Sequence, residues 1–519
     1  MRLAAACLLA LAALTCASPP PDDRCAVSIE AVDPESGRPA PALIRVTDAQ
    51  GRAVGFDGLL DRGIGLDDKH PAHRWSVLPG RRTVRLPRER LTFEAFRGLD
   101  TETARVEADL AGHDRAEIKL APRRFHDAAA RGWRNANTHL HLQKITREES
   151  DRYLLEVPAA DGLDALFVSH LERAEADREY ITNRYTEADL KALSARAGVL
   201  FGNGEEHRHN FGGFEQGYGH VMLLNIRKLV QPVSIGPGIM KKGTDGIPLQ
   251  RGIDEAKRDG ATAIWCHNTF GLEDIPNWVT GRPHAQNIFD GDPSTHGSYK
   301  DTFYRYLNAG LRVPFSTGTD WFIYDFSRVY AQVPSLKTQR DWLEALEKGR
   351  TYITNGPLLE FTVDDLAPGE TLRLERAGRV RVKARALGRV DFVRVELVRN
   401  GEVVHTADAR RDGGHVASEF TIDLEIGSPS WLALRIPPAE KGSPQSELGG
   451  PLFAHTSPVY VEVAGRHVSD AAASKGLLEE VKRAQETIAK SALFADEHER
   501  AHVMEVYAAA AAVLEKGLK

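Results

Sequence analysis

The chain is poor in cysteine and, after its first residues, in long apolar runs. Only four cysteines occur among 519 residues, which excludes a small disulfide-rich scaffold. No segment beyond the N-terminus reaches ~18 consecutive apolar residues, the length that a membrane-spanning helix needs. Basic and acidic residues nearly balance, at 67 and 73, so we expect no nucleic-acid partner. At ~100–200 residues per domain, the length predicts about three domains.

The N-terminus resembles an export signal. Arg2 gives a positive start, residues 3–14 are apolar, and small residues follow. We therefore assign residues 1–17 to a signal peptide and expect an exported protein, periplasmic or on the cell surface. Cys16 also resembles a bacterial lipoprotein attachment site, and plain cleavage near Ala17 is the alternative. Contact with a membrane is expected only through such a lipid anchor.

Short β-rich runs separated by turns occupy two regions of the chain. Residues 24–122 and residues 357–465 each contain several, and Asn400-Gly401 is a strong hairpin signal in the second region. This pattern predicts a β-sandwich on each side of a central domain. Residues 466–519 are rich in Ala, Glu and Lys and predict a short helical tail.

Strands alternate with amphipathic helices over residues 133–356. Gly260, Gly310 and Gly349 stand where three of these helices should end. Such alternation predicts a parallel sheet or barrel. The expected fold is therefore multidomain α/β plus all-β, with a central distorted (β/α) barrel between two sandwiches.

Histidines and acids cluster at the ends of the predicted barrel strands. They are His139, His141, His170, Glu205, Glu206, His220, His267 and Asp320. Residues two apart on a strand point the same way, so His139 and His141 can face one ion. Functional groups of α/β barrels gather at the carboxyl ends of the strands. We therefore expect these side chains to be ligands of a zinc, manganese or iron ion.

The order of these motifs resembles a known superfamily. The matching pieces are NTHLHLQK, FVSHLE, GNGEE, YGHVMLL, IWCHN, STGTDW and GRTYITNGPLLEF. They resemble the polymerase-and-histidinol-phosphatase (PHP) superfamily, and within it the CehA/McbA-type metallohydrolases. The resemblance covers only the central domain, and it implies a PHP-like barrel holding one or two divalent ions.

The same resemblance implies a ligand set. One ion would take His139, His141, Glu206 and Asp320, and a second would share Glu206 with His220 and His267. Glu205 is the alternative to Glu206 if the strand register differs by one. Two motifs depart from the family: the segment Val168-Ser169-His170 lacks the usual acid, and Asp320-Trp321-Phe322 lacks the usual histidine. We therefore expect one or two metals rather than three.

The expected activity is metal-assisted hydrolysis of a small-molecule phosphoester or a carboxyl or carbamate ester. Glu206 and His170 are the catalytic candidates, with His170 suited to proton transfer because the ordinary histidine pKa lies near 6.5. His207 and His209 are second choices for extending the site. Lys144, Arg173 and Arg208 could hold an anionic group of the substrate. The alternative is a non-catalytic cell-surface binding protein with a degenerate barrel.

Overall fold

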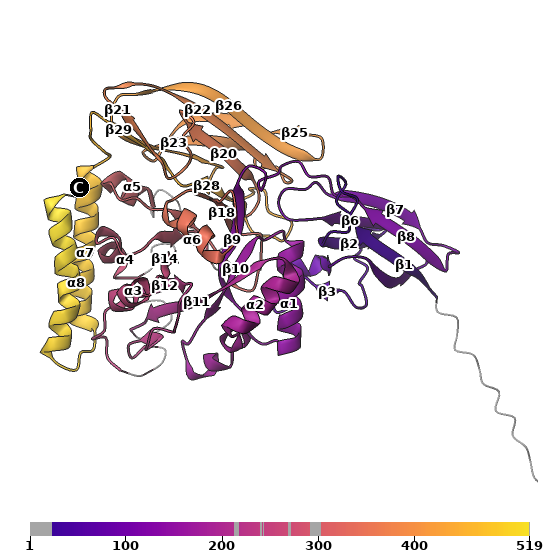
Figure 1. Ribbon diagram of the computed structural model, residues 1–519, viewed down its shortest axis with the longest axis horizontal. Coiled ribbons are helices and arrows are strands. Elements are labelled where there is room, and N and C mark those ends of the chain that lie inside the picture. The colour runs from indigo at the N-terminus through magenta and orange to yellow at the C-terminus, as the bar shows by residue number, and fades with distance from the viewer. Residues whose placement is uncertain are drawn as a thin grey trace, which may run out of the picture.

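The computed structural model describes residues 23–211, 217–238, 241, 243–267, 271–290 and 303–517. The signal peptide expected over residues 1–17, with Cys16, lies outside the described residues. Within the described part of the chain, no helix has both the length and the apolar character needed to cross a bilayer. The architecture is mixed α/β with several sheets (Figure 1).

Two sheets that share one core form the N-terminal region. Their strands are β1 (Arg24–Ala31), β2 (Ala42–Asp48), β3 (Leu60–Asp61), β4 (Ser76–Leu78), β5 (Arg82–Pro87), β6 (Arg90–Phe96), β7 (Ala104–Asp109) and β8 (Arg115–Leu120). One sheet has the order β5-β1-β8 and the other β3-β4-β2-β6-β7. Alternate apolar side chains from both sheets, such as Val27, Ile44 and Phe93, meet in the core between them.

A large curled sheet that closes on itself forms the middle of the molecule. Its strands here are β9 (Trp133–His141), β10 (Ala165–His170), β11 (Leu200–His209), β12 (Gly219–Leu224), β13 (Ser234–Ile235), β14 (Thr262–Cys266), β15 (Ala285–Asn287), β16 (Phe315–Ser316), β17 (Asp320–Trp321), β18 (Arg328–Gln332) and β19 (Thr351–Thr354). Strands β9, β10 and β11 are parallel, as are β14, β15 and β16. The sheet is not parallel throughout, however, because β12 runs antiparallel between β11 and β14.

Strand β9 is the seam at which this sheet closes. Its first half pairs antiparallel with β18, where Ala136 lies opposite Val329. Its last residues, Leu140 and His141, pair parallel with Asp320 and Trp321 of β17. The side chains at the end of β9 therefore lie beside those of β17.

Helices connect the strands of the curled sheet. They are α1 (Arg147–Ala160), α2 (Glu187–Ala197), α3 (Leu249–Arg258), α4 (Asp274–Val279), α5 (Arg305–Ala309) and α6 (Gln339–Glu347), with 3₁₀ turns at Pro71–Arg74, Glu175–Glu179 and Ile181–Arg184. Gly260, Gly310 and Gly349 follow α3, α5 and α6 with φ of 89°, 99° and 70°. The helix ends predicted from these glycines are confirmed, since glycine adopts positive φ without steric cost.

The C-terminal strands are continuous with the central sheet. They are β20 (Leu358–Val363), β21 (Thr371–Leu374), β22 (Gly378–Gly388), β23 (Arg394–Arg399), β24 (Glu402–Asp408), β25 (Arg410–Asp412), β26 (His415–Ile426), β27 (Ser430–Arg435), β28 (Ala454–Thr456) and β29 (Val459–Val463). One separate sheet has the order β20-β22-β26-β25. The others join the curled sheet because β28 pairs with β19. The predicted boundary near residue 356 is thus crossed by backbone hydrogen bonds.

Two long helices end the described chain. Helices α7 (Ala471–Ser491) and α8 (Glu497–Lys516) lie side by side against the α3–α5 side of the molecule (Figure 1). Leu477, Val481 and Tyr507 are buried in the core that also contains the inner residues of β12 and β14. The predicted helical tail is therefore packed into the fold.

Candidate metal centre

Four side chains direct one ligand atom each at a common point. The Nε2 atoms of His139 and His141 are 2.9 Å apart. Glu206 Oε2 lies 3.2 Å from the His141 nitrogen and 3.8 Å from the His139 nitrogen. Asp320 Oδ1 lies 3.4 Å from His139 Nε2 and 3.6 Å from His141 Nε2. All four ligand atoms lie within 4.8 Å of one another.

The strand seam explains how these residues meet. His139 and His141 share one face of β9, and Asp320 starts the strand that pairs with the end of β9. Gly318 allows the approach, because an added Cβ would come within 2.5 Å of the His139 Cβ. Asp320 has a φ of 57°, in the left-handed region that Asp tolerates better than most residues.

The hydrogen bonds of the two histidines decide where their protons lie. His141 Nδ1 donates to the Ser169 carbonyl at 2.9 Å, and His139 Nδ1 donates to Asp290 Oδ2 at 2.7 Å. In the neutral rings, both Nε2 lone pairs then face each other across 2.9 Å. Two lone pairs at that distance repel, so the two nitrogens need either a proton between them or a metal ion shared with the carboxylates. The donor set, with each Nδ1 held by an acceptor, fits a divalent ion.

The electrostatics of the cluster also favour positive charge. Burial lowers the pKa of His139, but Asp290, Asp320 and Glu206 outweigh burial and raise this pKa well above 6.5. Burial raises the pKa of Glu206, but Arg208 and the neighbouring histidines hold it well below 4.5. The Glu206 carboxylate is thus ionised although it is buried.

The second carboxylate oxygen of Glu206 faces another group of side chains. Glu206 Oε1 lies 3.3 Å from His220 Nδ1 and 3.9 Å from His267 Nε2. These three residues form the second set predicted from the sequence. Arg208 lies in the same place, since its guanidinium donates to Glu206 Oε1 at 3.1 Å and to His220 Nε2 at 2.8 Å.

Asp290 is a site residue that the sequence analysis missed. It accepts from His139 Nδ1 at 2.7 Å and from the Asn287 amide at 2.8 Å, and it lies 3.3 Å from His267 Nδ1. Asp290 follows β15, a strand of only three residues. The available signal was the apolar pair Ile288-Phe289 directly before this acid.

The two faces of β11 separate the remaining candidates. Glu206 and Arg208 point into the cluster. Glu205 instead accepts from the Val230 backbone N–H at 2.7 Å and contacts His207 Nδ1 at 3.0 Å. His209 Nε2 pairs with Asp245 Oδ1 at 2.9 Å. The structure therefore brings Glu206, and not Glu205, His207 or His209, to the cluster.

The other candidates lie around the cluster. His170, at the end of β10, places Nε2 3.5 Å from Glu172 Oε1, and burial lowers its pKa below 6.5. Lys144 is exposed on the turn after β9. The Arg173 guanidinium lies 4.9 Å from the ring centroid of Trp321, whose ring is 5.3 Å from that of His141. Arg173 is thus linked to the predicted ligand His141 through the Trp321 ring.

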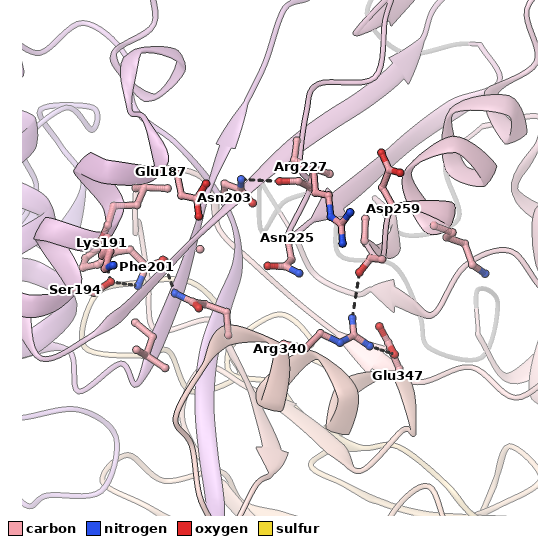
Figure 2. A pocket seen from close by; sticks show the side chains of 18 of the residues that line it. Glu187, Lys191, Ser194, Phe201, Asn203, Asn225, Arg227, Asp259, Arg340 and Glu347 are labelled. Atoms are coloured by element: carbon pink, nitrogen blue, oxygen red, sulfur yellow. Dashed lines mark hydrogen bonds and ion pairs between the residues drawn. The ribbon is translucent and has the colours of Figure 1, made fainter.

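A cavity of about 960 Å³ lies at the opposite end of the curled sheet. Figure 2 shows its polar lining, including Asn203, Asn225 and Arg227, with Arg340 held by Glu347 at 2.7 Å. It opens near the starts of β11 and β14, whereas the cluster lies near their ends. No residue of the cluster lines it, so it is separate from the candidate centre.

Comparisons with known proteins give little. No family model matches the chain, and no curated protein matches it. Two solved structures of the β-glucuronidase of Parabacteroides merdae, one with glycerol in its active site, are 10% identical to it with TM-scores of 0.18 and 0.16. The alignments cover 83% of this chain but only 60% and 62% of the glucuronidase chains. Likeness this low carries no argument about fold or activity.

Proposed function

We propose that this chain is an exported metal-dependent hydrolase of the CehA/McbA type. The observation that carries the proposal is the convergence of His139 Nε2, His141 Nε2, Glu206 Oε2 and Asp320 Oδ1 on one point. Without a metal, a proton on His139 would have to relieve the repulsion between the two imidazole nitrogens. A divalent ion relieves the same repulsion and gives all four atoms a shared partner.

A divalent ion bound here would supply a Lewis acid that polarises the scissile bond and acidifies water. The chain's own residues have separate tasks. Asp290 and the Ser169 carbonyl fix the ring orientations of His139 and His141. His170 is the candidate for proton transfer: its lowered pKa leaves it neutral at about pH 7, so it would accept a proton from the attacking water and then pass that proton to the leaving group.

The substrate side of the centre is aromatic and cationic. Trp321 lies beside His141, and Arg173 lies over the Trp321 ring. The Arg173 guanidinium is also fixed by Asp177 Oδ2 at 2.8 Å. We propose that this wall holds an anionic or planar organic group. A phosphoester or a carboxyl or carbamate ester of a small organic molecule fits these surroundings, and Lys144 remains a predicted contributor.

The finer fold is part of the same proposal. We interpret the curled sheet with its helices as a PHP-like distorted barrel. The paired sheets before and after it are interpreted as β-sandwiches, the second fused to the barrel through β28 and β19. Export with cleavage near Ala17, or lipidation at Cys16, is likewise proposed, and mass spectrometry of the mature N-terminus distinguishes the two.

The test combines elemental analysis with a substrate panel. The full chain, purified without chelator, should contain zinc, manganese or iron, and it should hydrolyse at least one member of a panel of phosphate, carboxyl and carbamate esters. His139→Ala and Glu206→Ala should each lose the metal and the activity. His415→Ala is the matched control, since His415 starts β26 and pairs with Glu102 of the N-terminal region rather than with any residue of the cluster.

The outcomes separate the competing functions. Metal bound without hydrolysis of any ester would favour the degenerate binding protein. A protein that holds no metal, or that keeps full metal content in both His139→Ala and Glu206→Ala, would contradict the proposed centre. Loss of activity in His415→Ala alone would place the chemistry elsewhere.

A further inference from the structure

Arg208 is built into the centre of the second predicted ligand set. It lies on β11 directly opposite His220 on β12, in the antiparallel register that joins the two strands. Its guanidinium makes three hydrogen bonds: to Glu206 Oε1 at 3.1 Å, to His220 Nε2 at 2.8 Å and to Asn210 Oδ1 at 3.2 Å. The side chain is only 6% exposed. The sequence pattern Glu206-x-Arg208-x-Asn210 puts all three on one face of the strand.

These bonds use the atoms that a second ion would need. Glu206 Oε1 and a nitrogen of His220 are two of the three donors in the predicted second set. Because His220 Nε2 accepts from Arg208, the neutral ring carries its proton on Nδ1, the atom that faces Glu206 Oε1. The third member of that set, His267, approaches Glu206 Oε1 at 3.9 Å through Nε2 and Asp290 Oδ2 at 3.3 Å through Nδ1.

Charge gives an independent argument. The cluster contains three carboxylates, from Glu206, Asp290 and Asp320. The guanidinium stays protonated at any accessible pH and contributes one positive charge. One divalent ion then neutralises the two negative charges that remain. A second divalent ion would leave a buried excess of positive charge directly beside Arg208, which is strongly unfavourable where water is excluded.

We propose that Arg208 takes the place of a second metal ion, so that the centre binds one divalent ion through His139, His141, Glu206 and Asp320. This inference rests on the proposed function. Arg208 is then a positioning residue: it holds Glu206 Oε1 and His220, and it leaves Glu206 Oε2 for the ion. A role in binding the anionic part of a substrate would require it to break these bonds.

Metal stoichiometry tests the inference without any substrate. The full chain is stripped with chelator and equilibrated with Zn²⁺ or Mn²⁺, and bound metal is measured by elemental analysis after dialysis. The wild type should hold one equivalent. Arg208→Ala should hold two, because Glu206 Oε1, His220 and His267 become available. Arg208→Gln serves the same purpose if the alanine variant unfolds, since it keeps much of the volume and removes the charge.

The Mn²⁺ forms give a second readout by electron paramagnetic resonance. We expect the six-line spectrum of an isolated ion in the wild type and a spin-coupled spectrum in the Arg208 variants. Arg373→Ala, which removes an arginine with 74% exposure in the C-terminal region, is the matched control and should stay at one equivalent.

Each result decides a different claim. Two equivalents with coupled spins in the wild type would overturn the role of Arg208 and leave the metal centre standing. One equivalent in a folded Arg208→Ala and Arg208→Gln would also overturn it, because something else would exclude the second ion. No bound metal in the wild type would instead contradict the proposed function itself.

Discussion

His139 and Asp290 are joined by a 2.7 Å hydrogen bond although 151 residues separate them in the chain. Both side chains are buried. The bond fixes the His139 proton on Nδ1 and turns Nε2 towards His141, Glu206 and Asp320. One carboxylate outside the four predicted ligand atoms therefore sets the orientation on which the centre depends.

Asp290→Asn should weaken metal binding without removing it. An asparagine oxygen still accepts the hydrogen bond from His139 Nδ1. Without the negative charge, however, the imidazole ring becomes a weaker ligand for the metal ion. Changes to such supporting groups typically cost about 10–100-fold in metal affinity. Competition with a chromophoric chelator measures the change. Asp68→Asn, an exposed acid in the N-terminal region, should leave the affinity unaltered, and an unaltered affinity in Asp290→Asn would remove Asp290 from the centre.

Gly318→Ala should disturb the seam between β9 and β17. The new methyl group would come within 2.5 Å of the His139 Cβ and 2.8 Å of its backbone nitrogen, so the strands must move apart. Overpacking of this kind costs about 1–3 kcal/mol, and we expect metal content to fall with it. Thermal melts and elemental analysis measure the two effects. Gly427→Ala adds a methyl group where no atom lies within 4 Å and should change neither.

Local sequence signals were sufficient to predict the helix ends and the common direction of His139 and His141. The spacing of His139 and His141 on one strand fixes their common direction whatever the rest of the fold does. The sequence did not determine which side chains of β11 face the cluster. A shift of one residue exchanges Glu206 for Glu205, and only the pairing with β12 decides between them.

Long-range pairing accounts for the remaining differences. The antiparallel direction of β12 and the bond between β28 and β19 depend on where the strands lie in space. Asp290 follows a strand too short to produce a period-two pattern. Arg208 was predicted to hold an anionic group of the substrate, because the sequence gives no sign of its hydrogen bond to His220.

Arg62→Ala should destabilise the protein strongly. Arg62 binds the Asp161 carboxylate through Nε at 3.2 Å and through an Nη at 2.6 Å, and both side chains are 0% exposed. The pair links the N-terminal region to the end of α1. Removing the arginine leaves the Asp161 carboxylate buried without its counter-charge, which should lower the free energy of unfolding by about 3–5 kcal/mol. Urea denaturation gives the free energy of unfolding.

The matched control for this pair is Arg24→Ala. Arg24 binds Asp57 at 3.0 Å, but these side chains are 51% and 83% exposed. Exposed pairs contribute about 0–1 kcal/mol. If the two variants lost the same stability, the buried pair would not be holding the N-terminal region to the central sheet and its helices.

Asp274 should make the stability of the protein fall with rising pH. Burial raises the pKa of Asp274 from 3.8 to about 7, and Tyr306 and Arg305 offset this only in part. Between these two values the folded protein binds more protons than the unfolded chain, so unfolding becomes easier as pH rises. Above about pH 7 the charged form is buried and the whole cost is present.

Asp274→Asn should flatten that profile, because asparagine still accepts from the Tyr306 hydroxyl and never ionises. The measurement is the free energy of unfolding of both proteins at steps between about pH 4 and pH 7, taken as a difference so that other groups cancel. Glu273, whose pKa burial also raises to about 7, stays in both proteins. A constant difference across this range would show that Asp274 does not take up its proton on folding. A difference that favours the variant increasingly towards neutral pH would establish a protonated acid beneath α7 and α8, where α4 meets the C-terminal helices.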